Sequence, residues 1–181
     1  MLSHNQRTHQ SIRGQDYEAE LHITLRDIIA SHKQILNIGD KTIRVTIPAG
    51  VADGQRLKLR GYGGNAPQGG VRGDLYITFR IEQDATFTRE GNNLHTTTTI
   101  PLTTAVLGGE ITIATLTGEV RIKINAATQS GTKMRLKGKG LPLYKKEGQY
   151  GDLIVTINLS IPSTLNTTQR ELFEKLRETG C

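Results

Sequence analysis

The chain has 181 residues and a formal net charge of +6, which permits one large domain or two small ones and an acidic partner. Its one cysteine, Cys181, excludes an internal disulfide and a zinc site built from cysteines. No stretch of about 18 apolar residues occurs, so we expect no membrane contact. Residues 1–16 are predicted to be a polar linker, and they lack the apolar segment of a signal peptide. A cytoplasmic location is therefore expected.

The first half of the chain alternates apolar and polar residues, which is typical of strands with one buried face. In residues 17–25, for example, Leu21 and Ile23 alternate with Glu20 and His22. The glycine and proline positions between such segments predict turns and strand ends. The predicted elements are strands at 17–25, 34–38, 42–47, 56–60 and 74–81, a turn at 26–31, a hairpin turn at Gly39–Asp40 and a glycine-rich loop at 61–73.

The same succession of elements returns in the second half. When residues 43–63 are shifted by 77 onto 120–140, seven of the 21 positions are identical. One residue is then inserted, after which Gly73-Asp74-Leu75 lies on Gly151-Asp152-Leu153. A shared offset over so long a stretch indicates an internal repeat. The predicted elements of this half are strands at 94–102, 110–116, 119–125, 133–137 and 152–161 and a helical turn at 103–109.

A repeat of about 77 residues is too long for a solenoid unit and suits a small sandwich. We therefore predict a mostly β fold with two tandem, homologous β-sandwich domains and a C-terminal helix. The expected divisions are a linker at 1–16, a first β domain at 17–86, a second at 87–161 and a C-terminal helical segment at 162–181.

The end of the chain predicts a helix at residues 167–179. Thr168 and Glu171 have the spacing of a capping box, and Asn166 is an alternative cap. So short a helix is marginal alone, so it must pack on its own domain or on a second chain. The residues expected to make that contact form an apolar stripe: Leu172, Phe173 and Leu176.

The sequence offers no convincing catalytic or metal-binding constellation. No histidine has a second histidine two or four positions later, as a metal pair on one face requires. Asp74 and Asp152 occupy the same place in the two repeats, so a turn-forming role explains both. The glycine runs at 61–64 and 138–140 are not followed by a helix, which a phosphate loop needs. We therefore expect a protein that is not an enzyme and needs no cofactor.

With catalysis and metal binding set aside, binding of a partner at the protein surface is the remaining class of function. The positions of Ala19 and Leu21 in the first repeat are taken by Thr96 and Thr98 in the second. If both copies share a fold, the apolar side chain of Leu21 is not needed for the core and could line an apolar groove. Basic residues also gather in two rows, one in each repeat, which favours nucleic-acid binding as the alternative function. These rows are Arg56, Lys58 and Arg60, and Arg135, Lys137 and Lys139.

Together these segments resemble the C-terminal substrate-binding region of DnaJ-type co-chaperones, over residues 14–180. Unlike full-length DnaJ, this sequence shows no J domain and no His-Pro-Asp motif. It also has no CxxCxGxG repeats, and in this it resembles the zinc-free subgroup, which includes the bacterial curved-DNA-binding relatives. The matching segments are Gly14-Gln15-Asp16, LRDIIASH, IRVTIPAGVADGQRLKLRGYG, GDLYITF, FTREGNNL, TAVLGG, LKGKGLP and GDLIVTI.

The resemblance implies two β-sandwich-like domains, a C-terminal dimerisation helix and a shallow apolar groove on the first domain. It also implies non-native polypeptides and a DnaK-type chaperone as partners, with a homodimer as the assembly. The acidic tail of the DnaK-type partner would bind near Lys33 and Lys41. The groove lining implied by the family falls on Ala19, Leu21, Leu36, Ile38 and Ile77.

The sequence therefore predicts a co-chaperone fragment that binds unfolded polypeptide in this groove and delivers it to a DnaK-type chaperone. The alternative is a basic, DNA-binding protein similar to the curved-DNA-binding relatives. Salt dependence separates the two, because binding to phosphates weakens steeply with salt and binding in an apolar groove does not.

Overall fold

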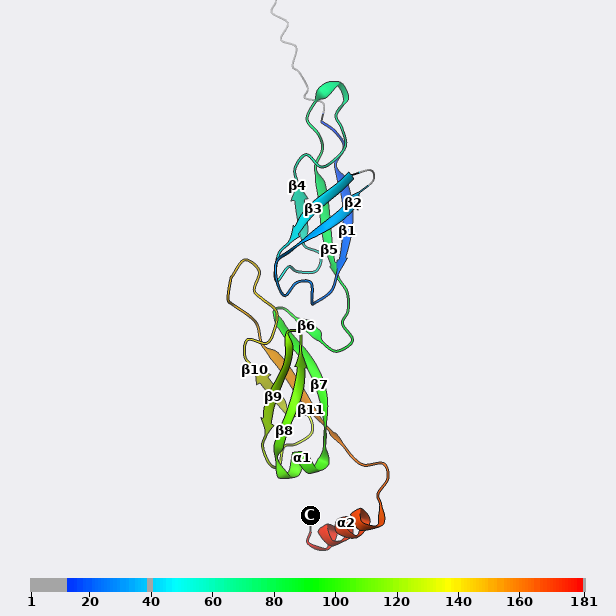
Figure 1. The fold of residues 1–181 in the computed structure, drawn as a ribbon, viewed down its shortest axis with the longest axis vertical. Helices are drawn as coiled ribbons and strands as arrows, with labels where there is room; N and C mark the ends of the chain where they lie inside the picture. The colour runs from blue at the N-terminus through cyan, green and yellow to red at the C-terminus, as the bar shows by residue number, and fades with distance from the viewer. Residues whose placement is uncertain (1–12, 39–40, 181) are drawn as a thin grey trace, which may run out of the picture.

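The computed structural model of the protein describes residues 13–38 and 41–180, apart from the side chains of Lys41 and Gln68. It confirms a mostly β fold with two β-sandwich units in tandem and a C-terminal helix (Figure 1). The predicted hairpin turn at Gly39–Asp40, most of the predicted linker and Cys181 lie outside the described residues. The elements are β1 Tyr17–Ile23, β2 His32–Ile38, β3 Lys41–Ile47, β4 Arg56–Leu59, η1 Pro67–Gly69, β5 Leu75–Ile81, β6 Thr88–Glu90, β7 Asn93–Pro101, α1 Leu102–Leu107, β8 Gly109–Thr115, β9 Gly118–Ile124, β10 Lys133–Leu136, β11 Leu153–Ser160 and α2 Thr167–Glu178.

The first half pairs a three-stranded sheet with a two-stranded one. The larger sheet has the order β1-β5-β4, with β1 parallel and β4 antiparallel to β5. The antiparallel pair β2-β3 forms the second sheet. Alternation along each strand sends one set of side chains into the core, and in β3 these are Ile43, Val45 and Ile47.

The second half repeats this pattern, and the offset found in the sequence also fixes the strand register. Leu36 lies opposite Ile43 in the first hairpin, and Ile113 lies opposite Val120 in the second, each 77 residues further on. The order β7-β11-β10 corresponds to β1-β5-β4, with the same parallel and antiparallel pairs. The two halves are therefore copies of one topology, as the sequence predicted.

One strand breaks the equivalence. The short strand β6 pairs antiparallel with β7 and extends the second large sheet to the order β10-β11-β7-β6. Strand β6 was not predicted from the sequence, because three residues are too few for an alternating pattern to be recognised. The helix η1 was not predicted either, and β2 begins at His32, two residues before its predicted start at Gln34.

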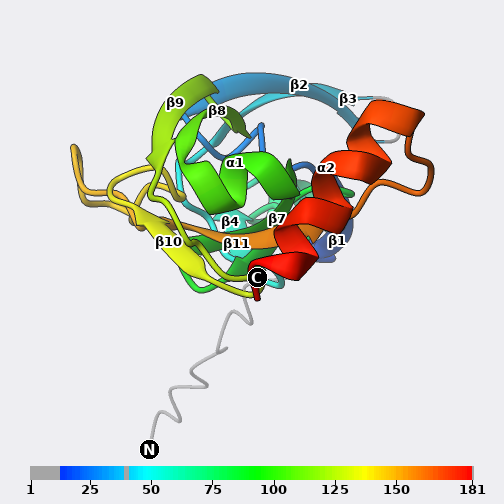
Figure 2. The ribbon, with the colours of Figure 1, turned by 90° about the horizontal axis from the view of Figure 1, so that it is seen from below.

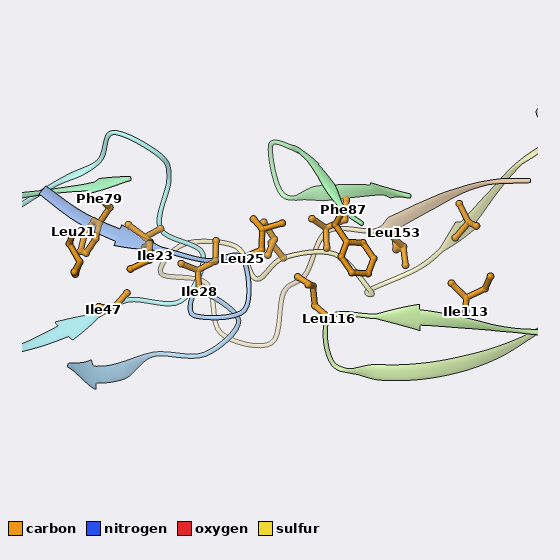
Figure 3. Packing of buried hydrophobic residues seen from close by; sticks show 14 of the residues in the cluster. Leu21, Ile23, Leu25, Ile28, Ile47, Phe79, Phe87, Ile113, Leu116 and Leu153 are labelled. Carbon is orange, nitrogen blue, oxygen red and sulfur yellow. The ribbon is translucent and has the colours of Figure 1, made fainter. Parts of the chain in front are cut away.

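The buried apolar side chains of the two halves belong to one cluster. Figure 3 shows them running from Leu21 in the first half, past Phe87 and Leu116, to Ile113 in the second. Two arginines bridge the halves through backbone carbonyls. Arg26 donates to Leu116 at 3.2 Å, and Arg89 donates to Val51 at 3.0 Å.

The C-terminal helix α2 begins at the alternative cap and not at the expected capping box. The Asn166 side chain accepts a hydrogen bond from the backbone N–H of Gln169, whose own side chain accepts one from the Asn166 N–H. The expected pair Thr168 and Glu171 lies within the helix, so that prediction was wrong. Figure 2 views the molecule from the end that carries α1 and α2. Among the described residues, no helix is long and apolar enough to cross a membrane.

Candidate functional site

The two halves differ at one edge of their larger sheets. Among the described residues, this edge is uncovered in the first half, and the equivalent edge of the second half is covered by another strand. Strand β1 is the outer strand of its sheet, with β5 as its only partner among the described residues. The equivalent strand β7 lies between β11 and β6, so its edge is covered. An uncovered edge presents backbone donors and acceptors to which another extended segment can pair.

The glycine before β1 and its counterpart before β7 differ in backbone conformation. Gly91 has a φ of +62°, which turns the chain from β6 back into β7. Gly14, which is 77 residues earlier, does not have a positive φ, and its N–H donates to Val71 O at 2.8 Å. Gly14 and Gln15 thus lie against the glycine-rich loop just before β1, and β5 is the only strand that pairs with β1 within the described residues.

The glycines of this loop allow backbone segments to come very close. A Cβ on Gly14 would lie 2.1 Å from the Gly64 carbonyl oxygen, and one on Gly73 would lie 2.1 Å from that of Gln15. A Cβ on Gly151 would meet the Asn92 carbonyl oxygen at the same distance in the second half. The glycine-rich loop thus forms a backbone slot, lined by Gly64 and Gly73, that holds the residues just before β1. Its glycines therefore have a packing role, and no phosphate-binding role is needed to explain them.

The inner side chains of β2 are less covered than their equivalents in β8. Leu36 and Ile38 pack against the core but stay partly exposed. At the same positions of the second hairpin, Ile113 and Thr115 are buried. The first half therefore has partly exposed apolar side chains on β2, where the side chains at the equivalent positions of β8 are buried.

The other three predicted groove residues lie on β1 and β5, at different depths. Ala19 is partly exposed, Leu21 retains 9% exposure and Ile77 retains 0%. Ala19 and Ile77 are neighbours in the β1–β5 pairing. Ile77 thus lies beside Ala19 on the same face of the sheet, and because it is fully buried it presents no surface to a ligand in this structure. We define the β1–β2 seam as Ala19, Leu21, Leu36 and Ile38.

Polar residues near the seam point elsewhere. Lys33 is exposed and alternates with the inner positions of β2, so it lies on the opposite face of that strand from Leu36. The Lys41 side chain lies outside the described residues. On the outer face of the larger sheet, Glu18 and Glu20 of β1 pair with Arg56 and Arg80, both at 2.7 Å.

Asp74 and its equivalent Asp152 have structural partners in both halves. The N–H of Gly61 donates to Asp74 at 2.9 Å, and the N–H of Gly138 donates to Asp152 at 2.8 Å. Lys58 approaches Asp74 at 2.9 Å, and the pKa of this carboxyl lies below its ordinary value because Lys58 and the Gly61 N–H both stabilise its charge. The two carboxylates each hold a turn, which supports their interpretation as turn residues.

The predicted apolar stripe of α2 is largely exposed within one chain. Leu172, Phe173 and Leu176 retain 55%, 37% and 49% exposure. A cavity of about 290 Å³ separates them from the end of the second sandwich, where Pro101 and Leu102 form part of its wall. In the described part of the chain, no group of three or more His, Cys, Asp or Glu side chains is placed to hold a metal ion.

Sequence reasoning missed the role of Gly14 and of β6. The available signal was Gly91-Asn92, a turn dipeptide before the alternating residues of β7. Its counterpart Gly14-Gln15 has the same glycine without the asparagine.

Comparison with known proteins places these features in a family. The model of the DnaJ C terminal domain matches residues 17–162. The chaperone protein DnaJ of Deinococcus proteolyticus is 38% identical over 91% of this chain and 50% of its own length. The DnaJ of Leptothrix cholodnii is 44% identical over 76% of this chain and 36% of its own. The mitochondrial chaperone protein dnaJ GFA2 of Arabidopsis thaliana is 41% identical over 76% and 30%. The chain thus spans at most about half the length of these relatives.

Proposed function

The chain belongs to the DnaJ C-terminal domain family, and we propose that it is the part of a DnaJ-type co-chaperone that binds unfolded polypeptide. The family membership and the names of the relatives support this assignment. Delivery of the bound polypeptide to a DnaK-type chaperone is part of the same proposal. Within it, Lys33 and Lys41 are the candidate contacts for an acidic tail of that partner.

The proposed binding site is the β1–β2 seam together with Ile77, which lies beside Ala19 in the β1–β5 pairing. The observation that carries it is the difference between the two copies. Ala19, Leu36 and Ile38 are partly exposed, and the β1 edge is unpaired among the described residues, whereas β6 covers the equivalent edge of β7. An extended polypeptide can pair with an open edge and place alternate side chains on the apolar residues beside it.

Such a site binds weakly and without strong sequence preference. Burying two or three aliphatic side chains of the substrate yields on the order of 4–7 kcal/mol. Ordering an unfolded segment offsets much of this gain, so micromolar to millimolar affinity follows. Two seams in one dimer raise the effective affinity by multivalency. The α2 stripe is the proposed dimer contact, because Leu172, Phe173 and Leu176 are exposed in one chain.

The test compares two neighbouring residues on opposite faces of β2. Leu36→Asp places a charge in the seam, where contact with an apolar substrate would desolvate it at a cost of several kcal/mol. Ile35→Asp makes the same chemical change at a side chain that is 60% exposed on the other face. We expect Leu36→Asp to abolish suppression of aggregation of a denatured protein and Ile35→Asp to retain it. Circular dichroism checks the fold of both variants.

A milder variant keeps the test meaningful if Leu36→Asp unfolds. Ile38→Thr introduces the residue that the second copy carries at this position, where Thr115 is buried without disturbing the same topology. It should weaken binding of a fluorescent unfolded polypeptide several-fold and leave the melting temperature nearly unchanged. Full binding by folded Leu36→Asp or Ile38→Thr would remove the seam as the binding site.

A further inference from the structure

The second copy holds a strand of its own at the edge that the first copy leaves uncovered. Strand β6 pairs antiparallel with β7, and its residues Thr88 and Arg89 lie opposite His95 and Leu94. The equivalent strand β1 has β5 as its only partner among the described residues. Because both copies share one topology, β6 shows how an extended segment can pair with this edge.

The segment that contains β6 stays beside β7 beyond the paired residues. Ala85 and Thr86, which precede the strand, line a hollow of about 420 Å³ together with Thr97 of β7. The antiparallel direction therefore continues past the end of β6. One further step of the register places Phe87 opposite Thr96.

The side chains of this segment alternate between the core and the solvent. Phe87 retains 4% exposure and Arg89 is partly buried, whereas Thr88 between them is exposed. The carboxylate of Asp84 fixes the start of the segment, since it accepts hydrogen bonds from the N–H groups of Thr86 and Phe87 at 2.8 and 3.0 Å. The second copy therefore fills the inner side of this edge with an aromatic ring.

The first copy keeps the same edge positions and leaves them uncovered. Tyr17 takes the place of Leu94, and it is 41% exposed where Leu94 is fully buried. Ala19 takes the place of Thr96, and it is partly exposed where Thr96 is buried. Tyr17 and Leu21 flank Ala19 on the same face, about 13 Å apart at about 3.3 Å per residue. The small alanine between these larger side chains leaves room for a ring.

The exposed side chain of Tyr17 has a defined position. A Cβ on Gly64 would lie 3.3 Å from the Tyr17 hydroxyl oxygen, so the end of this side chain lies close to the glycine-rich loop. A tyrosine held in this way provides contact area at a low cost in side-chain entropy. Tyr17 is not among the groove residues expected from the sequence, and it extends the β1–β2 seam at the end of β1 nearest that loop (Figure 1).

We propose that a polypeptide bound at the β1–β2 seam takes the direction and register of β6. It runs antiparallel to β1 and places an aromatic side chain over Ala19, between Tyr17 and Leu21. The residue two positions later lies over Tyr17, and the residue between the two faces solvent. This inference rests on the proposed function, to which it adds the direction of the polypeptide and the class of side chain that it presents.

The probe for this inference copies the segment that the second copy uses. It is the peptide Asp-Ala-Thr-Phe-Thr-Arg-Glu-Gly, the sequence of residues 84–91, compared with the same peptide carrying Phe87→Ala. Titration into the isotope-labelled full chain, followed by nuclear magnetic resonance of the amides, gives both dissociation constants. The ring should raise the affinity about 10-fold, since part of its surface is buried. Amides in 17–23 should respond, and those in 93–101 should not, because β6 covers their edge.

Variants at residue 19 test where the ring binds. Ala19→Leu fills the space between Tyr17 and Leu21 and should reduce the advantage of the aromatic peptide to about 2-fold. Ala19→Thr introduces the residue that the second copy carries and should act in the same direction if leucine disturbs the sheet. Ala114→Leu makes the matched change at an exposed strand position of the second copy and should keep the full advantage. Thermal denaturation checks the fold of each variant.

A nitroxide label at either end of the peptide reports its direction. Antiparallel pairing in the register of β6 places the N-terminus of the peptide near Leu21 and its C-terminus near Tyr17. A label at the N-terminus should therefore broaden the amide signals of 21–23 more than those of 15–17. A label at the C-terminus should have the opposite effect.

Three results would overturn this inference and leave the proposed function standing. Reversed broadening would show a parallel segment, and equal affinities of the two peptides would remove the aromatic preference. An unchanged 10-fold advantage in folded Ala19→Leu would place the ring elsewhere. In each case, loss of binding of a denatured protein in Leu36→Asp would still support the seam. Retention of that binding in folded Leu36→Asp would remove the seam itself, and this inference with it.

Discussion

At the scale of single residues, close backbone contacts depend on glycines that the sequence shows only as turn formers. Gly14 and Gly73 belong to the slot that holds the start of β1, and neither needs a positive φ. Composition and spacing indicate a loop here, but they do not show which other segment of the backbone packs against it. The same limit applies to Ile77, whose full burial in the core its place in the alternating pattern does not reveal.

A Cβ at Gly73 should destabilise the first half. Gly73→Ala places this atom 2.1 Å from the Gln15 carbonyl oxygen, and relief of such overpacking costs about 1–3 kcal/mol. Gly54→Ala is the control, because its Cβ would meet no atom within 4 Å and only its φ of +72° is unfavourable. Urea denaturation should show the larger loss for Gly73→Ala. Equal losses would mean that the backbone has room to move apart.

The charge of Asp74 should make stability depend on pH. Its pKa is lowered in the folded protein, first by Lys58 and then by the Gly61 N–H. The stabilisation is therefore complete above the unfolded pKa of about 3.9 and is lost as the pH falls through the folded value. Asp74→Asn should be less stable than the unsubstituted chain at pH 7, and the difference should shrink toward pH 3. A constant difference would show that the charge is irrelevant.

At the scale of elements, alternation and the repeat predicted most strands and both copies of the sandwich. The two copies could be aligned because most strands keep an offset of 77, as Leu36–Ile43 and Ile113–Val120 illustrate, and β5 and β11 keep an offset of 78 after the inserted residue. Strand β6 was not predicted because it is short. For this reason the covered edge of β7 could not be predicted either. Of the five predicted groove residues, Ala19, Leu36 and Ile38 are partly exposed, and the depth of each follows from packing that spacing does not encode. The groove itself stays a prediction.

The C-terminal helix should hold two chains together. The stripe Leu172, Phe173 and Leu176 is amphipathic and exposed in one chain, and a 12-residue helix is marginal without a packing partner. We expect the intact chain to sediment as a dimer, and a chain ending at residue 164 to sediment as a folded monomer. Phe173→Glu should weaken the dimer in the same direction. A monomeric intact chain at micromolar concentration would contradict this assignment.

At the scale of the whole molecule, the two halves share one apolar cluster, which argues for cooperative behaviour. Phe87 and Leu116 of the second half and Leu25 of the first are all buried near the junction (Figure 3). Separate sandwiches would be expected to move independently if their interface were small and polar. The divisions at 17–86 and 87–161 remain a prediction from the sequence, and the shared cluster suggests that they unfold together.

Calorimetry should therefore show one unfolding transition for the intact chain. Phe87→Ala removes a large buried side chain at the junction, at a cost of about 3–5 kcal/mol, and should separate the transitions of the two halves. Phe79→Ala makes the same change inside the first half, away from the second. It should lower stability by a similar amount and leave the two halves coupled. Two transitions in the unsubstituted chain would refute the coupling.

The most direct test of the central claim is hydrogen exchange of the full chain with and without a permanently unfolded polypeptide. The second copy again serves as the internal control, because β6 covers the edge of β7. Binding in the β1–β2 seam should slow exchange of backbone amides in 17–23 and 32–38 and leave those in 93–101 and 109–115 unchanged. Equal protection in both copies, or protection confined to the second, would contradict the assignment of the seam as the polypeptide-binding site.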